Sequence, residues 1–187
     1  MEFAYAELRP LAPGAVGDLS EAVVGVYAAA FAGPPYDEGS AARSRFAPRW
    51  IAHASAPGWR GVGAWVDGDL IGFAYGHSAR AGLPWVDAVV AQLAPPTRIK
   101  WCADAFLLCE LAVAPAHQGR RLGSLLHDAL IDEAPHATAL LTTLDDRTTA
   151  GARLYARRGW RRLGTSYVAS GYPHRYVAMG LRLDRCG

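Results

Sequence analysis

A strand, a turn, a helix and a second strand, which follow one another in the second half of the chain, constrain the fold most. Residues 106–113 form an apolar run, residues 120–134 carry leucines at helical spacing, and residues 138–144 read TALLTTL. A strand, a crossing helix and a strand in this order make a right-handed connection between parallel neighbours of one sheet. The chain is therefore expected to be an α/β protein with a mixed sheet.

The rest of the chain predicts further helices and strands around this unit. Asp18 and Glu21 are spaced like the capping box of a helix, and the Asp67–Gly68 pair between two apolar runs is typical of a β-hairpin. The other predicted strands are 5–11, 160–168 and 176–183, and the other predicted helices are 40–54, interrupted at Pro48, and 149–158, closed by Gly159. With the hairpin, about six to seven strands flanked by helices are expected.

Residues 79–104 do not follow this alternation and are interpreted as a helical insertion between strands. Pro84 is placed to begin a short helix, which we expect to end at Pro95–Pro96. The insertion is expected to belong to the same domain as the strands around it.

The length and the composition are those of one globular domain, residues 1–187. Hydrophobic residues make up 51% and charged residues 19%, which is far from the composition of a disordered chain. No apolar run reaches the ~20 residues that a membrane span needs, and the first residues do not resemble a signal peptide. We therefore expect no membrane partner.

Cysteines and charges exclude other classes of partner. Cys102, Cys109 and Cys186 are odd in number and lack metal-ligand spacing, which predicts a reducing cytoplasm and no bound metal. The net charge is +2 and Lys100 is the only lysine, so a nucleic-acid footprint is not expected. The arginines cluster locally, which suits a small polyanion better than a long one.

Residues 118–124, which read QGRRLGS, point to an anion site. The start of a helix exposes unpaired N–H groups and the positive end of the helix dipole. Gly119 and Gly123 have no side chain, so an anion can approach the main chain closely. These are the properties that bind a diphosphate, although the sequence is neither a P-loop nor a dinucleotide fingerprint.

Two segments resemble motifs of one family. Val113 to Leu126 reads V-x-P-x-x-Q-G-x-x-L-G-x-x-L, and residues 148–160 read TTAGARLYARRGW. The first is similar to the acetyl-CoA signature of the GNAT superfamily of N-acetyltransferases, and the second to a later segment of the same family. Arg121 stands where the family has a glycine, and Thr148 stands where it has an asparagine.

This resemblance implies a binding site for acetyl-CoA as co-substrate. The main chain of Leu111, Ala112 and Val113 would pair with the pantetheine arm like an added strand, and Thr148 would face that arm. Arg121 would either turn outward while its N–H still serves or bring its guanidinium to a phosphate. The residues expected to hold the diphosphate are Gln118, Gly119, Arg120, Arg121, Leu122, Gly123 and Ser124.

Two residues would then carry the chemistry. Glu110, a carboxylate within an apolar strand, would be the general base for the incoming amine, and Tyr155 would protonate the departing CoA thiolate while touching the cofactor. The alternative for Glu110 is a carboxylate satisfied by local backbone N–H groups. The alternative for Tyr155 is a core residue of an amphipathic helix.

The acceptor is less constrained by the sequence. Tyr36, Trp85 and Trp101 are candidates for the wall of an acceptor site, since aromatic rings suit a cationic or ring-bearing amine. The function expected is transfer of an acetyl group to a primary amine of a small molecule, such as an antibiotic or another metabolite. The alternatives are a peptide or protein amine as acceptor, an O-acyl or longer-acyl transferase, and a CoA-binding module without catalysis. The resemblance is also compatible with a homodimer.

Overall fold

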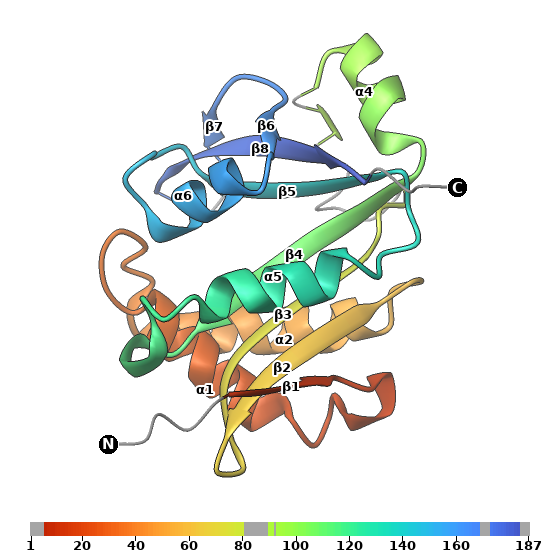
Figure 1. Ribbon diagram of the computed structural model, residues 1–187. Coiled ribbons are helices and arrows are strands. Elements are labelled where there is room, and N and C mark those ends of the chain that lie inside the picture. Colours follow the sequence, from red (N-terminus) through yellow and green to blue (C-terminus); the bar gives the residue numbers. More distant parts are fainter. Residues whose placement is uncertain (1–5, 81–89, 92, 169–172, 184–187) are drawn as a thin grey trace. The chain divides into compact units, whose positions relative to one another are not determined.

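The computed structural model describes residues 6–80, 90–91, 93–168 and 173–183. Its contacts divide the chain into two compact units. The first unit contains Met1–His77 and Cys109–Ala134, and the second contains Ser78–Leu108 and Pro135–Gly187. Both units take part in a mixed α/β architecture, as expected, with the strands and helices labelled in Figure 1.

Within the described residues, eight strands form the hydrogen-bonded sheet, in the order β1-β2-β3-β4-β5-β8-β6, with β7 paired to β8. The predicted parallel pairing is confirmed: Ala105–Leu107 of β4 run parallel to Thr138–Leu140 of β5. The strands are β1 (Glu7–Pro10), β2 (Arg60–Val66), β3 (Asp69–Ser78), β4 (Ala105–Val113), β5 (Thr138–Leu144), β6 (Arg161–Arg162), β7 (Tyr167–Val168) and β8 (Arg175–Arg182).

In the first unit, helices cover both faces of β3. Phe73 and Tyr75 of β3 share a core with α1 (Ser20–Phe31) and α2 (Ala42–Ala54). Gly72, which points the other way in the pleat, faces Leu126 of α5 (Leu122–Ile131). Figure 1 shows α5 in front of β3, and α1 and α2 behind it.

The β2–β3 hairpin closes as predicted. Asp67 and Gly68 both have positive φ, 51° and 90°, which is the conformation of a type I′ turn. Three short 3-10 helices precede longer elements of the first unit: Pro13–Ala15, Gly39–Ala41 and Pro115–His117.

In the second unit, β5 and β8 are paired along their length, from Thr138 opposite Arg182 to Leu144 opposite Tyr176. The helices of this unit include α4 (Pro95–Cys102) and α6 (Ala150–Arg157). Gly180 of β8 is required by packing, because a Cβ there would lie 2.7 Å from the Trp101 ring of α4. Gly159 follows α6 with a φ of 79°, which confirms its predicted role in closing that helix.

Several local predictions were wrong, each for a physical reason. Leu19 is the N-cap of α1 and makes no side-chain cap, so the capping box of Asp18 and Glu21 does not form. Pro48 lies inside an uninterrupted α2. Pro95 begins α4, a helix that was not predicted, because proline suits the first turn, where its missing N–H has no partner anyway.

Other boundaries differ by a few residues, and one predicted element is not covered. The strand predicted at 5–11 is Glu7–Pro10, and the helix predicted at 120–134 is Leu122–Ile131. The helix predicted from Pro84 lies mostly outside the described residues, as does Cys186. In the described part of the chain, no helix is both long and apolar enough to cross a membrane.

Candidate active site

Glu110 lies in the first unit, on β4, with its side chain 14% exposed. Its Oε2 accepts a hydrogen bond from Nη2 of Arg49 in α2 at 2.9 Å, and the two side chains form an ion pair. A carboxylate held this far from water must find such a partner, because an unpaired buried charge is very costly. The Glu110 carboxylate is therefore tolerated in the apolar strand β4 because it forms an ion pair with Arg49 of α2.

The pKa of Glu110 is raised to about 7. Burial is the main cause, since it penalises the charged form, and the negative charge of Glu38 acts in the same direction. The Arg49 guanidinium and the Leu111 backbone N–H oppose the rise. A carboxyl group with a pKa near neutrality can take up and release a proton at physiological pH, which is what a general base needs.

Arg49 is itself held by aromatic rings. Its guanidinium lies 5.3 Å from the Phe46 ring centroid and 5.7 Å from that of Tyr27, and its Nη2 reaches the Tyr27 hydroxyl at 3.4 Å. Cation–π contacts of this kind fix the plane of a guanidinium. The orientation of Arg49 toward Glu110 is thus set by residues of both α1 and α2.

Two tyrosines and a second carboxylate complete the surroundings of Glu110. Tyr27 donates to Oε1 of Glu38 at 2.7 Å, and burial raises the pKa of Tyr27. Burial first, and then the charge of Glu110, raise the pKa of Tyr36 to about 12. Tyr36, an acceptor-site candidate, therefore lies within electrostatic reach of Glu110, and its ring packs edge-on against Phe31 at 4.6 Å.

The loop before α5, predicted as an anion site, contains two residues with positive φ. Gly119 has a φ of 74°, and a Cβ there would meet no atom within 4 Å, so the loop is open on that side. Arg121, the N-cap of α5, has a φ of 64° and a ψ of 2°, in the left-handed region. The family glycine at this position would suit that conformation without strain, whereas an arginine is strained there.

The Gln118 side chain and the backbone N–H groups after it differ in their hydrogen bonds. The Gln118 side chain donates from Nε2 to the Val113 carbonyl at 2.9 Å, which braces the loop against the end of β4. Within the described ranges, the N–H groups of Gly119, Arg121, Leu122 and Gly123 find no backbone acceptor. Arg120 and Ser124 flank them; the Ser124 N–H donates to the Arg121 carbonyl at 2.9 Å.

The end of β4 extends past its pairing with β5. Register pairs between the two strands run from Ala105 to Leu107, whereas β4 continues to Val113. On the β3 side, the N–H of Ala114 donates to the Ile71 carbonyl at 2.9 Å. Among the described residues, no register pair joins Leu111, Ala112 and Val113 to β5, and the main chain there is a candidate partner for a ligand.

The second unit contains Tyr155 and Thr148. Tyr155 lies on α6, is 8% exposed, and packs edge-on against Trp160 with ring centroids 5.8 Å apart. The Thr148 hydroxyl and N–H both donate to Oδ1 of Asp146, at 2.7 and 2.8 Å. The exposed Thr148 thus serves the turn that leads into α6, and Thr149 is the residue that caps this helix.

Trp101 is the acceptor-site candidate that belongs to the second unit. Trp101 is 8% exposed, lies under the Arg182 guanidinium at 4.7 Å and packs on β8 within the second unit. Trp85 lies outside the described residues. Tyr36, the candidate of the first unit, lies within reach of the charge of Glu110.

Sequence reasoning missed the residues that surround Glu110. Arg49 and Tyr27 belong to helices and Glu38 directly precedes the 3-10 helix Gly39–Ala41, all far from Glu110 in sequence; Arg49 is 61 residues from its partner. A further group, His53, His77 and Cys109, gathers beside them with all three donor atoms within 4.8 Å of one another. Burial, and then His77 and Arg49, lower the pKa of His53 to about 4. Spacing along the chain carried no signal for either cluster.

The mixed sheet with its helices defines an α/β protein, and the buried carboxyl group with a pKa near neutrality is its candidate general base. Comparison with known families makes this specific. The model of the Acetyltransferase (GNAT) family matches residues 23–160, which is well over half of the chain. The chain belongs to this family and is an acyltransferase.

Individual relatives agree with this assignment. A GCN5-like protein acetyltransferase of Mycobacterium tuberculosis is 26% identical over 73% of this chain and 81% of its own length. The structure of yncA from Salmonella typhimurium with its cofactor acetyl-CoA has a TM-score of 0.60 at 18% identity, covering 97% and 96% of the two chains. Aminoglycoside 6'-acetyltransferase type Ii has a TM-score of 0.65 at 15% identity, covering 97% and 99%. At these identities the two solved structures show a shared fold.

Proposed function

We propose that this protein transfers the acetyl group of acetyl-CoA to a primary amine of a small molecule, with Glu110 as the general base. The position of Glu110 carries the proposal. It is a buried carboxyl group with a pKa raised to about 7, and it directly precedes the end of β4, where the described residues show no register pair with β5. An attacking amine must lose its proton, and a base with this pKa accepts that proton at neutral pH.

The loop and the start of α5 fit acetyl-CoA. The open space beside Gly119 and the amides of Gly119, Arg121, Leu122 and Gly123 that lack a backbone acceptor in the described chain offer donors to a diphosphate. Leu111, Ala112 and Val113 offer main-chain groups to the pantetheine arm, as an added strand would use them. The similar fold of the Salmonella protein solved with acetyl-CoA supports this choice of co-substrate.

Residues around Glu110 and on α6 have separate tasks in this proposal. Arg49 orients the Glu110 carboxylate and keeps its pKa from rising further. Tyr155 donates its hydroxyl proton to the departing thiolate, as the family resemblance implies, and Thr148 remains a proposed neighbour of the pantetheine arm. The acetyl donor supplies the thioester, and the residues named bind it, orient it and move protons.

The acceptor site is proposed to include Tyr36, with Trp85 and Trp101 as further candidates. Tyr36 lies near the base, and its half-buried ring suits a ring-bearing or cationic amine. The fold shared with an aminoglycoside acetyltransferase supports a small-molecule acceptor. The relative from Mycobacterium tuberculosis is a protein acetyltransferase, and this favours a protein amine as the second candidate.

A transfer assay tests the proposal. The protein is incubated with acetyl-CoA and, in parallel, with aminoglycosides, polyamines, aryl amines and lysine-bearing peptides, and free CoA thiol is measured. We expect thiol release above the hydrolysis background with small amines, and acetylated product by mass spectrometry. Thiol release with lysine-bearing peptides and with no small amine would show that the acceptor is a protein amine. Calorimetry with acetyl-CoA that detects no binding would refute the acetyl-CoA site itself.

A further inference from the structure

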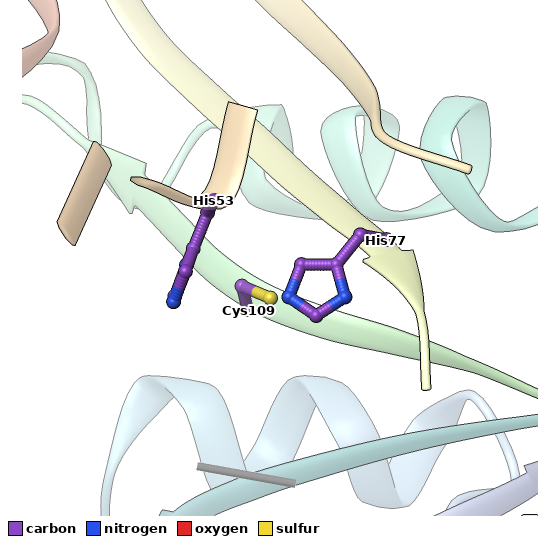
Figure 2. A group of neighbouring side chains, drawn as sticks. All are labelled: His53, His77 and Cys109. Atoms are coloured by element: carbon purple, nitrogen blue, oxygen red, sulfur yellow. The ribbon is translucent and has the colours of Figure 1, made fainter. Parts of the chain in front are cut away.

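Two histidines and a cysteine from three different elements converge in the first unit. His53 lies on α2, His77 on β3 and Cys109 on β4, and one donor atom of each lies within 4.8 Å of the other two. Figure 2 shows the Cys109 sulfur beside the His77 ring, with the His53 ring on the other side. The three residues come from distant parts of the chain, so the fold alone brings them together.

The donors are of the types that bind zinc. Zinc in proteins takes cysteine thiolate and neutral histidine nitrogen, commonly in a tetrahedral set. Softer divalent ions share these preferences, whereas calcium and magnesium need oxygen ligands, which this group lacks. The chemistry therefore selects zinc or a tetrahedral ion that resembles it.

The surroundings hold the ligands in place. His77 is 2% exposed, and its ring lies 5.3 Å from the His53 ring, nearly perpendicular to it. The Tyr75 hydroxyl lies 3.1 Å from Nδ1 of His53. Bonds of this kind orient the imidazoles of metal sites, since a fixed ring presents its free nitrogen to the ion.

The spacing requires only a small adjustment. Ligand atoms around a tetrahedral zinc ion are about 3.5 Å apart, given metal–ligand bonds of about 2.0–2.3 Å. The present limit of 4.8 Å therefore shrinks by roughly 1 Å when the ion binds, which rotation of the side chains achieves. With three protein donors, the fourth position is left for water, the arrangement of open zinc sites.

We propose that His53, His77 and Cys109 form a binding site for one zinc ion. On binding, the Cys109 thiol loses its proton to solvent, a zinc–sulfur bond forms, and two imidazole nitrogens donate lone pairs, so one proton is released per ion. This departs from the expectation of no metal that the cysteine spacing suggested. The binding claim is independent of the acyl-transfer proposal.

The position of the ion gives it a structural consequence. His53 follows Arg49 by one helical turn on α2, and Cys109 precedes Glu110 on β4. Two consecutive residues of β4 thus reach the same helix, a departure from strict alternation along a strand. A zinc ion would tie α2 to β3 and β4 next to the Arg49–Glu110 ion pair and so hold both partners of that pair in register.

Cobalt titration tests the site. The untagged protein is stripped with chelator, dialysed and titrated with Co²⁺, and the absorption spectrum is recorded. We expect the intense visible bands of a tetrahedral ion and a thiolate-to-cobalt charge-transfer band, saturating at one ion per chain and lost when Zn²⁺ displaces Co²⁺. Zinc should also raise the unfolding temperature of the stripped protein. Absence of the charge-transfer band in the folded wild-type protein would overturn the proposal.

Variants identify the ligands. Cys109→Ser should abolish the charge-transfer band and weaken zinc binding more than about 100-fold, since even indirect changes cost about 10–100-fold. His53→Gln, at a half-exposed position, should weaken binding without the packing loss expected at His77. Cys102→Ser and Cys186→Ser are the matched controls and should keep the full band. A band that survives in folded Cys109→Ser, or disappears in Cys102→Ser, would contradict the assignment.

Discussion

Nη2 of Arg49 lies 2.9 Å from Oε2 of Glu110, and this ion pair joins helix α2 to strand β4 in the first unit. Each partner is only partly exposed, 26% for Arg49 and 14% for Glu110. Removing one charge from such a pair leaves the other without its counter-ion in a poorly hydrated place. The pair therefore has two effects: it orients the carboxylate and it limits the rise of the Glu110 pKa.

Replacing Glu110, the proposed base, should remove turnover and leave acetyl-CoA binding in place. In Glu110→Gln the side chain keeps its size but cannot accept a proton, so we expect kcat to fall by about 10²–10⁴-fold. The affinity for acetyl-CoA, measured by calorimetry, should stay within about twofold, since a change confined to the chemical step does not weaken binding.

The matched control is Glu133→Gln, another carboxylate that pairs with an arginine. Glu133, which follows α5, is 74% exposed and pairs with Arg60 of β2. Loss of the Glu133 charge should therefore leave turnover unchanged. Equal turnover in Glu110→Gln and the wild type would exclude Glu110 as the base.

The pH dependence should report the raised pKa of Glu110. A base acts only when deprotonated, so kcat/KM should rise with pH through about 7 in metal-free protein, with chelator in all buffers. Two acceptor amines of different pKa should be compared. If Glu110 causes the acidic limb, the rising part of the profile of kcat/KM against pH, its midpoint is the same for both amines. A midpoint that shifts with the pKa of the amine would show that the substrate, not Glu110, titrates.

Arg49 variants should shift this limb in a defined direction. Arg49 lowers the pKa of Glu110, so Arg49→Met should move the acidic limb to higher pH, and Arg49→Lys, which keeps the charge, should move it less. A merely structural role would reduce stability without moving the limb. Unfolding of both variants in urea separates the two outcomes.

The sequence predicted the crossover from β4 through α5 to β5 well and the segment before it less well. The strand at 138–144 was placed correctly because it is continuously apolar and bounded by Pro135 and the polar residues after Leu144. The start of α4 was missed because Pro95 was interpreted as a stop, although proline begins helices as readily as it ends them.

For the site, the sequence predicted what depends on local geometry. The loop of Gly119 and the start of α5 follow from residues that are neighbours in the chain, and Glu110 was noticeable as a carboxylate in an apolar strand. The partner of Glu110 was not predictable, because Arg49 approaches only after α2 packs on β3. No short motif spans that separation.

Arg121 supplies a prediction about stability. It has a φ of 64°, and a non-glycine residue in the left-handed region costs about 1–2 kcal/mol. Arg121→Gly should therefore raise the free energy of unfolding by about 1 kcal/mol, because the greater freedom of glycine in the unfolded chain offsets part of the gain. Urea unfolding at pH 7 measures it.

The neighbouring residue provides the control for this effect. Arg120 carries the same charge in the same loop but does not have positive φ, so Arg120→Gly should leave stability unchanged or reduce it. A gain of equal size in both variants would point to relief of charge repulsion between the two arginines. Adding salt distinguishes the causes, since screening diminishes a charge effect and leaves a backbone effect intact.

The cap of α6 should matter for the helix that carries Tyr155. The Thr149 side chain accepts a hydrogen bond from the Ala152 N–H at 3.1 Å and is 5% exposed. Thr149→Ala removes this cap and should lower the free energy of unfolding by about 1 kcal/mol, whereas Thr149→Ser keeps the oxygen and should recover most of the loss. If the alanine and serine variants were equally destabilised, the cause would be the lost packing of the threonine methyl group and not the cap. Hydrogen exchange at the Ala152 amide gives a second readout: it should keep the wild-type rate in Thr149→Ser, where the cap still forms.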